Sequence, residues 1–217
     1  MVPFPDPTTR NELVADCRRC PALVEARECI AWGNGPLDAT LVVIGEAPAA
    51  GDSTADTWKG GNWTGMAYTS RHSGRTVRRL MADLGYGPED CYYTNAAKCY
   101  PKDGESNRAP RDTELANCRS HLVDELSAIR PHAVLTTGKH ATRSVLAMES
   151  IALDGFLDAV LTPIDCPTLE VTLLPLLHPS YQAVWLSRLD FTYESYLEAI
   201  RTQLDGSKPN SSATYFI

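Results

Sequence analysis

The chain has 217 residues, of which 43% are hydrophobic, and it carries a formal net charge of −7 at pH 7. This length suits one domain with a sizeable core, no apolar run approaches the roughly 20 residues of a membrane span, and the acidic balance excludes a general electrostatic attraction to nucleic acid. Any binding of nucleic acid must therefore depend on a local basic face. Residues 1–7 have neither the basic region nor the apolar core of a secretory signal, so we expect a cytoplasmic protein.

Seven cysteines in such a chain argue against a disulfide framework and favour metal binding or buried thiols. After a proline-rich start, a short helix is expected from Asn11, carrying Cys17 and Cys20, and residues 22–26 add a helical turn. Two cysteines separated by two residues can place both thiolates on one metal, because the turn brings the sulfurs together. The glycines and proline in residues 31–36 indicate a loop.

Residues 41–44 are four consecutive apolar residues, three of them β-branched, which predicts a strand buried on both faces. The run ends at Gly45, Glu46 and Pro48. Ligands of open parallel sheets bind at the carboxyl ends of the strands, so Glu46 is a candidate for chemistry. The plain alternative is a solvated carboxylate in a strand-end turn.

The next segment, residues 51–65, is polar and rich in glycine but contains two tryptophans. Long loops of this sort in compact domains tend to be functional. Ser73 has N-cap chemistry, and apolar residues at helical spacing then predict a helix that Gly85 closes. The start and outer side of this helix could form a local basic face, or a merely solvated one, through Arg71, Arg75, Arg78 and Arg79.

The rest of the chain alternates strands and helices. Strands are expected at residues 91–99, 133–138 and 171–177, and helices at residues 112–130, 140–148 and 189–204. Pro175 inside the last strand demands an edge position or a bulge. The alternation indicates one α/β domain with a mainly parallel sheet, covering residues 1–205, with a flexible tail at 206–217.

The polar residues at the predicted strand ends form a first constellation: Glu46, Asn95, Gly138 and His178. Parallel strands would bring them into one cleft, where a carboxylate, an amide and an imidazole suit recognition of a planar heterocycle. The amide of Asn95 offers a donor and an acceptor, which can pair with an imide edge such as that of uracil. A turn amide and a structural histidine are the plain alternatives.

The second constellation is cysteine-based. Cys99 closes the strand of Asn95, and Cys118 shares the inner face of the following helix with Leu122. Together with Cys17 and Cys20 they could bind one zinc ion or one four-iron cluster, and the spacing does not choose between these. The remaining cysteines are expected to be buried thiols: Cys29, Cys91 and Cys166.

These motifs, taken in order, resemble those of family 4 uracil-DNA glycosylases over residues 17–204. The matching segments are Cys17-x-x-Cys20-Pro21, Gly45-Glu46-Ala47-Pro48, Thr94-Asn95-Ala96-Ala97-Lys98-Cys99, Cys118 and His178-Pro179-Ser180. The resemblance implies a three-layer α/β/α fold with a central four-stranded parallel sheet. It also implies a [4Fe-4S] cluster on the four cysteines named above.

The resemblance assigns roles residue by residue. Glu46 matches the acid that positions or activates water, Asn95 the asparagine that reads uracil, and His178 the histidine that contacts uracil O2 as negative charge develops. Tyr68 falls near the aromatic residue that stacks on the base, and backbone N–H groups near Ala47 would help to stabilise the anion. Contacts with DNA are expected from Arg71, Arg75, Ser180 and Tyr181, and from Lys98, for which a phosphate contact is favoured over a Schiff base. By analogy with the family, the residues after Ser180, including Tyr181 and Gln182, would enter DNA as a wedge.

Three departures from the family pattern stand out. Ala49 replaces a usual glycine, the loop to Tyr68 is longer, and residues 61–74 look closer to family 5, although the acid of that family is Arg71 here. The implied function is hydrolysis of the N-glycosidic bond of uracil in single- or double-stranded DNA by a monomeric enzyme. The alternatives are a glycosylase for hypoxanthine or xanthine and an iron–sulfur DNA-binding module whose active site has decayed.

Overall fold

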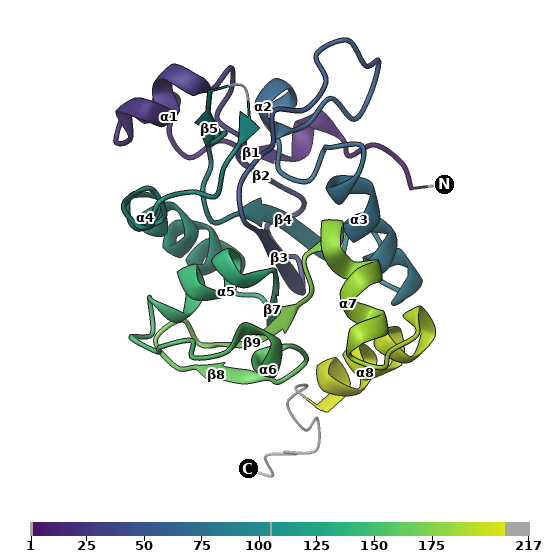
Figure 1. The fold of residues 1–217 in the computed structure, drawn as a ribbon. Coiled ribbons are helices and arrows are strands. Elements are labelled where there is room, and N and C mark those ends of the chain that lie inside the picture. Colours follow the sequence, from purple (N-terminus) through teal and green to yellow (C-terminus); the bar gives the residue numbers. More distant parts are fainter. Residues whose placement is uncertain (1, 105, 207–217) are drawn as a thin grey trace, which may run out of the picture.

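A computed structural model describes residues 2–104 and 106–206, and its centre is a seven-stranded sheet (Figure 1). The strand order is β1-β2-β4-β3-β7-β9-β8. The strands span β1 (Arg10–Asn11), β2 (Gly33–Asn34), β3 (Leu41–Gly45), β4 (Cys91–Asn95), β7 (Ala133–Thr137), β8 (Ile164–Cys166) and β9 (Val171–Leu176). Apart from Gly206, which ends the last helix, the predicted tail at 206–217 lies outside the described residues.

The four strands predicted from the sequence are the parallel core of this sheet. β3 pairs in parallel with β4 and β7, and β7 pairs in parallel with β9. β2 and β8 extend the core in antiparallel fashion at its two edges, and β1 pairs with β2. Pro175 lies in β9 beyond the end of β8, which pairs only with Val171–Leu173. No strand needs the missing N–H of Pro175 on that side, where its carbonyl accepts from the Leu161 N–H, so the proline has the local edge position that the sequence predicted.

Helices cover both faces of the sheet, which confirms the three-layer α/β/α fold (Figure 1). One face packs against α3 (Ser73–Asp83), α7 (Gln182–Arg188) and α8 (Tyr193–Gly206), and the other against α4 (Asp112–Ile129) and α5 (Lys139–Leu146). The shorter elements are α1 (Pro21–Ala26), α2 (Gly61–Thr64), α6 (Phe156–Ala159), two short 3-10 turns at Pro7–Thr9 and Pro179–Tyr181, and the β5 (Lys102–Asp103) and β6 (Ser106–Asn107) hairpin. Within the described ranges, no helix has the length and apolar character to cross a membrane.

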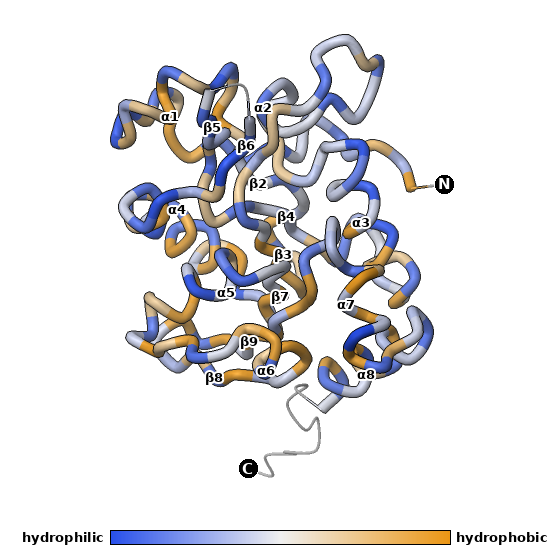
Figure 2. The backbone as a smooth tube through the Cα atoms, viewed as in Figure 1, coloured by the Kyte–Doolittle hydropathy of each residue, from blue (hydrophilic) through white to orange (hydrophobic). Residues whose placement is uncertain are grey.

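β3 shows why an unbroken apolar run is needed at the centre of the sheet. Leu41 and Val43 face the α3 side, whereas Val42 and Ile44 face the α4 side, and all four are buried. Because successive side chains point to opposite faces, a strand covered on both sides cannot alternate apolar with polar residues. Figure 2 shows the same pattern as hydrophobic colour along the inner strands and hydrophilic colour on the outer helical turns.

Two helix predictions are wrong. Arg10–Asn11 forms β1 rather than the start of a helix, and the helix of this region begins only at Pro21, whose fixed φ and missing N–H suit a first helical turn. The last helix begins at Tyr193 instead of residue 189, and a separate helix, α7, precedes it. Asp190, with φ of +57°, interrupts the helical conformation between these two helices.

Candidate active site

The carboxyl ends of the parallel strands meet at one cleft, as the sequence predicted. Glu46, Asn95, Thr137 and His178 line it, from the ends of β3, β4 and β7 and from the segment after β9. The register places Gly45 opposite Asn95. The outer part of the cleft has a volume of about 700 Å³ and reaches His140, Tyr181 and Trp185.

Two glycines allow these side chains to approach one another. A Cβ on Gly45 would lie 2.5 Å from Asn95 Oδ1 and 2.8 Å from Tyr68 Oη, so only a glycine lets the amide and the phenol meet over β3. Gly138 has φ of +93°, and a Cβ there would lie 3.0 Å from the His178 ring. The glycines at these strand ends therefore define the shape of the site.

Tyr68 forms a rigid inner wall of the cleft. It has φ of +53°, which is unusual for a residue with a side chain. Its hydroxyl lies 2.7 Å from Thr137 Oγ1, and its ring packs edge-on against Tyr93 with centroids 5.7 Å apart. Burial raises the pKa of the Tyr68 phenol, so the hydroxyl is neutral at physiological pH.

Asn95 is held from beneath by a buried ion pair. Lys98 Nζ lies 2.6 Å from Glu125 Oε2 and donates hydrogen bonds to Thr94 Oγ1 at 2.6 Å and to the Asn95 carbonyl at 2.9 Å. Lys98 and Glu125 are only 1% and 0% exposed at the side chain. The predicted contact of Lys98 with a DNA phosphate is therefore wrong, because the ammonium faces inward and is satisfied by three oxygens. The sequence carried no signal for Glu125, its partner on α4.

Glu46 and the two histidines share the cleft and interact electrostatically. Burial raises the pKa of the Glu46 carboxyl, and the charge of His140 lowers it in part. Burial lowers the pKa of His178, and His140 lowers it further. The lowered pKa leaves the His178 imidazole neutral at neutral pH. The raised pKa of Glu46 means that its carboxylate binds a proton more readily than an exposed glutamate does.

A backbone hydrogen bond selects the tautomer of His178. The N–H of Ser180 donates to His178 Nδ1 at 3.2 Å. Since Nδ1 accepts, the proton of the neutral ring resides on Nε2. His178 therefore presents an N–H donor from its other nitrogen.

His140 is a cleft residue to which the sequence analysis assigned no role. It lines the same cleft as Glu46 and His178, and its buried Nδ1 has no hydrogen-bond partner among the described residues. The available signal was its position, two residues after the glycine that follows β7, where α5 begins.

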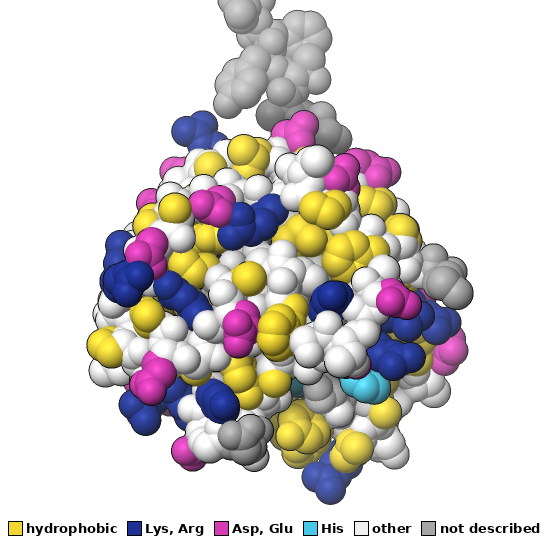
Figure 3. All heavy atoms as spheres, turned by 90° about the horizontal axis from the view of Figure 1, so that it is seen from above, with side chains coloured by type: hydrophobic (Ala, Val, Ile, Leu, Met, Phe, Trp, Pro, Cys, Tyr) yellow, Lys and Arg dark blue, Asp and Glu magenta, His cyan; other side chains and the backbone are white. Residues whose placement is uncertain are grey.

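The arginines predicted as a basic face divide into two groups. Arg71 and Arg79 are exposed and Arg75 is half-buried, but Arg78 is 8% exposed and bonds to Tyr68 O and Asn34 Oδ1. Arg78 is therefore structural, which corrects its inclusion in that face. Figure 3 shows basic and acidic side chains interspersed on the surface seen from above, so positive charge is local there and not general.

The residues after His178 also differ in their exposure. Ser180 and Tyr181 are exposed, Tyr181 at 61%, and the Tyr181 ring lies 5.9 Å from that of His178. Gln182, predicted to enter DNA with them, is 7% exposed and faces the core. Only the first two are placed where a DNA strand could touch them.

The four predicted cysteine ligands lie around one small cavity between α1 and α4. Cys17, Cys20, Cys99 and Cys118 all line it. Cys29 is half-buried, whereas Cys91 and Cys166 are fully buried, and none of these three lines the cavity. The division of the seven cysteines into four and three agrees with the sequence prediction, but Cys29 is half-buried and not the buried thiol expected.

The surroundings of this cavity fit a sulfur-rich anionic group. Arg27 donates to Cys99 Sγ at 3.2 Å, and Asn117 donates to Cys20 Sγ at 3.3 Å. His121 is 2% exposed and lines the same cavity, and neither ring nitrogen has a partner among the described residues. In the described part of the chain, no three His, Cys, Asp or Glu side chains converge as ligands of a single metal ion.

Comparison with known proteins identifies the family. The model of the uracil DNA glycosylase superfamily matches residues 32–202, which include the strands of the parallel core and all the cleft residues named above. The chain belongs to this superfamily.

Relatives of two types resemble the chain. It is 32% identical over 150 residues to the Type-4 uracil-DNA glycosylase of Saccharolobus solfataricus, covering 64% of this chain and 63% of that protein. It is 34% identical over 164 residues to the Type-5 uracil-DNA glycosylase of Pyrobaculum aerophilum, covering 63% and 67%. A Type-4 uracil-DNA glycosylase of Thermotoga maritima is 27% identical over 79% of this chain and 80% of its own length. The match to the first of these spans less than two thirds of that protein.

Proposed function

We propose that this chain hydrolyses the N-glycosidic bond of uracil in DNA and leaves an abasic site, as part of base-excision repair. The observation that carries the proposal is the meeting of Glu46, Asn95 and His178 in one cleft with Tyr68 as its wall. Membership of the superfamily and the names of the relatives support the same reaction.

Recognition starts with a uracil flipped out of the DNA stack, because a stacked base is unreachable. The amide of Asn95 pairs with the imide edge, and Tyr68 packs against the ring and crowds the position that a thymine methyl would occupy. The ion pair of Lys98 with Glu125 supports this step by fixing the backbone carbonyl of Asn95.

Bond cleavage leaves negative charge on uracil and cationic character on the sugar. The Nε2–H of His178 and the backbone near Ala47 donate to uracil O2, and removal of one such donor typically costs about 3 to 4 kcal/mol of transition-state stabilisation. Glu46 orients a water molecule, which adds to the anomeric carbon of the sugar. The carboxylate accepts the proton that this water loses, and uracil departs with the electron pair of the broken bond.

The DNA is held by exposed groups around the cleft. We assign Arg71 and Arg75 to phosphates and Ser180 and Tyr181 to the strand beside the flipped base. Tyr181 has the size, exposure and closeness to His178 that filling the gap left by the base requires.

The test is a set of oligonucleotides that carry uracil, hypoxanthine or xanthine at one position, each single-stranded and duplexed. We expect an alkali-sensitive abasic site from uracil. Cleavage confined to a purine lesion would establish the alternative glycosylase, and binding without cleavage of any of these substrates would establish the decayed DNA-binding module.

We propose further that Cys17, Cys20, Cys99 and Cys118 hold a [4Fe-4S] cluster, as suggested by the family resemblance. Four cysteine side chains around one cavity and two side-chain N–H donors aimed at sulfur support this assignment. When bound, the cluster serves as a structural crosslink, since its ligands come from the segment before α1, the turn after β4, and α4.

The proposed [4Fe-4S] cluster can be tested by absorption spectroscopy. The purified protein is expected to be brown, with broad absorption near about 400 nm, and Cys118→Ala is expected to lose that absorption together with iron. Cys166→Ala is the matched control, because Cys166 is equally buried but remote from the cavity. A colourless protein with stoichiometric zinc would contradict the assignment.

A further inference from the structure

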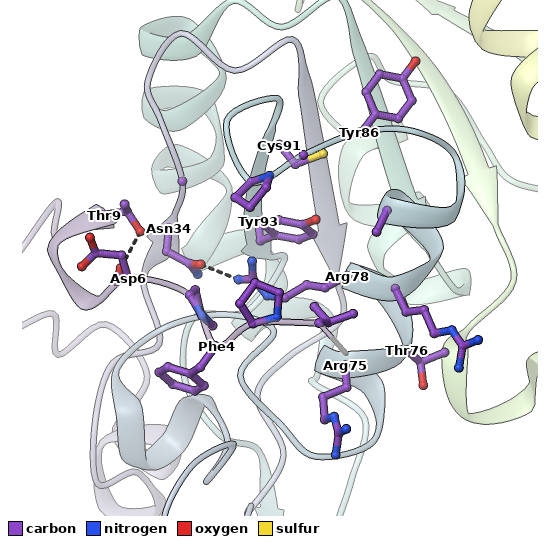
Figure 4. A pocket seen from close by; sticks show the side chains of 18 of the residues that line it. Phe4, Asp6, Thr9, Asn34, Arg75, Thr76, Arg78, Tyr86, Cys91 and Tyr93 are labelled. Atoms are coloured by element: carbon purple, nitrogen blue, oxygen red, sulfur yellow. Dashed lines mark hydrogen bonds between the residues drawn. The ribbon is translucent and has the colours of Figure 1, made fainter.

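A second pocket lies behind the wall of the cleft. It has a volume of about 900 Å³ and runs between the amino-terminal segment, α3 and β4 (Figure 4). Tyr93 lines this pocket and Tyr68 lines the cleft, and their rings are in edge-on contact. Of the residues that line this pocket, only Arg71 and Arg75 already have a proposed role, as phosphate contacts beside the cleft.

The pocket carries an excess of positive charge in an otherwise acidic chain. Arg71, Arg75, Arg78 and Arg79 line it. Only Arg79 forms an ion pair with a described carboxylate, that of Asp83 at 3.5 Å. Two acids, Asp6 and Asp83, line the pocket against these four arginines, so the lining keeps a net positive charge. An anion would therefore be attracted to the guanidinium groups of this pocket.

Arg78 forms a rigid cationic floor. Its guanidinium stacks on the Tyr93 ring at 3.9 Å, and its hydrogen bonds go to neutral oxygens of Asn34 and Tyr68. Figure 4 shows it against Tyr93 and reaching toward Asn34, with Phe4 and Arg75 lining the same pocket. Because these acceptors are neutral, they do not cancel the positive charge of Arg78, which can attract an anionic ligand.

The pocket also offers flat apolar surface. Phe4 is fixed edge-on against Trp58, with ring centroids 5.3 Å apart, and Arg75 lies 5.9 Å from the centre of the same indole. Val2, Pro3, Pro5 and Tyr86 add to this wall. A ligand that combines a ring with a negative group matches such a lining.

The pocket adjoins the cleft through one short segment. Ser70 and Ser73 line the cleft, whereas Arg71 and Arg75 line the pocket. A DNA strand that leaves the cleft over this segment would lead toward the pocket.

We infer that this pocket binds a nucleotide, its phosphate between Arg71, Arg75 and Arg79 and its base against Phe4. The assignment of the nucleotide to the DNA strand that flanks the excised base rests on the proposed function. A free mononucleotide presents the same chemistry and is the other source to test.

The test uses ligands without uracil, so that it does not depend on excision. Binding of a labelled oligothymidylate is followed by fluorescence anisotropy, and thymidine monophosphate is titrated by calorimetry. Thr76→Glu adds a carboxylate to the pocket without altering any residue of the cleft. Thr202→Glu adds the same charge to an exposed turn of α8 and is the matched control.

Thr76→Glu is expected to weaken oligothymidylate binding on the order of tenfold and to reduce its salt dependence, whereas Thr202→Glu leaves both unchanged. If thymidine monophosphate also binds and is weakened by Thr76→Glu, the pocket accepts free nucleotides. If only the oligonucleotide responds, the occupant is the strand. Equal affinities in Thr76→Glu and Thr202→Glu overturn the inference. Nucleotide binding through the pocket without uracil excision would refute the proposed function alone.

Discussion

Replacing Glu46 by glutamine is expected to slow uracil excision by about 10²- to 10⁴-fold, the usual contribution of general acid–base catalysis. Glutamine keeps the size and polarity of the side chain but cannot accept a proton from water. The measurement is single-turnover cleavage of a uracil-containing single strand with enzyme in excess, so that product release does not mask the chemical step.

The pH profile supplies a second readout for Glu46. Burial raises the pKa of this carboxyl in the folded protein. The active carboxylate is present above that pKa, so wild-type activity is expected to fall on acidification at a pH above the usual 4.5 of glutamate. Glu46→Gln is expected to lack this acidic limb and to show only the residual rate.

The control for this experiment is Glu198→Gln, which removes a carboxylate from an exposed turn of α8. It is expected to retain the wild-type rate and pH profile. Wild-type excision by Glu46→Gln would show that the water is activated elsewhere, and His140, which lines the same cleft, would be the next residue to replace.

Replacing Lys98 by methionine is expected to destabilise the fold by about 3 to 5 kcal/mol, the usual cost of leaving one charge of a buried pair without its partner. Glu125 would then remain at 0% exposure, with the hydroxyls of Tyr92 and Thr94 as its only donors among the described residues. The measurement is urea unfolding followed by circular dichroism. Absorption near about 400 nm, where the cluster is expected to absorb, is monitored in parallel to detect its loss.

Two further variants show whether the loss of stability comes from breaking the ion pair of Lys98 with Glu125. Lys139→Met removes an exposed lysine and is expected to change the urea midpoint little. The double variant Lys98→Met with Glu125→Leu removes both charges and is expected to be more stable than Lys98→Met alone. Equal midpoints for Lys98→Met and Lys139→Met would contradict the buried ion pair.

The parallel core could be predicted because its signal is local. Each of its strands is an apolar run that ends in glycine or a polar residue, and parallel strands necessarily bring such ends together. Asn95 and His178 were therefore assigned to one cleft before any contact was known, and the structure places both there. The assigned roles, the monomeric state and the cytoplasmic location stay predictions.

The errors concern residues whose environment is set by distant parts of the chain. Lys98 follows a strand end and looked like a cation beside a DNA cleft, but Glu125 on α4 draws it inward. Arg78 shares a helix with exposed arginines, yet the helical period turns it toward Tyr93 and Asn34. In both cases the sequence shows the charge and conceals its partner, because ion pairs between separate elements follow no local spacing.

The turn from Asn95 to Cys99 positions residues of two separate sites. Asn95 faces the cleft, Cys99 faces the cysteine cavity, and Lys98 lies buried between them. The N–H groups of Ala96 and Ala97 also donate to the carbonyls of Gly45 and Glu46, so the turn is fastened to the next strand. One inserted or deleted residue would force the chain to misplace either the amide or the thiolate. Insertions that a surface loop tolerates would fail here, and the length of this turn is as constrained as its residues.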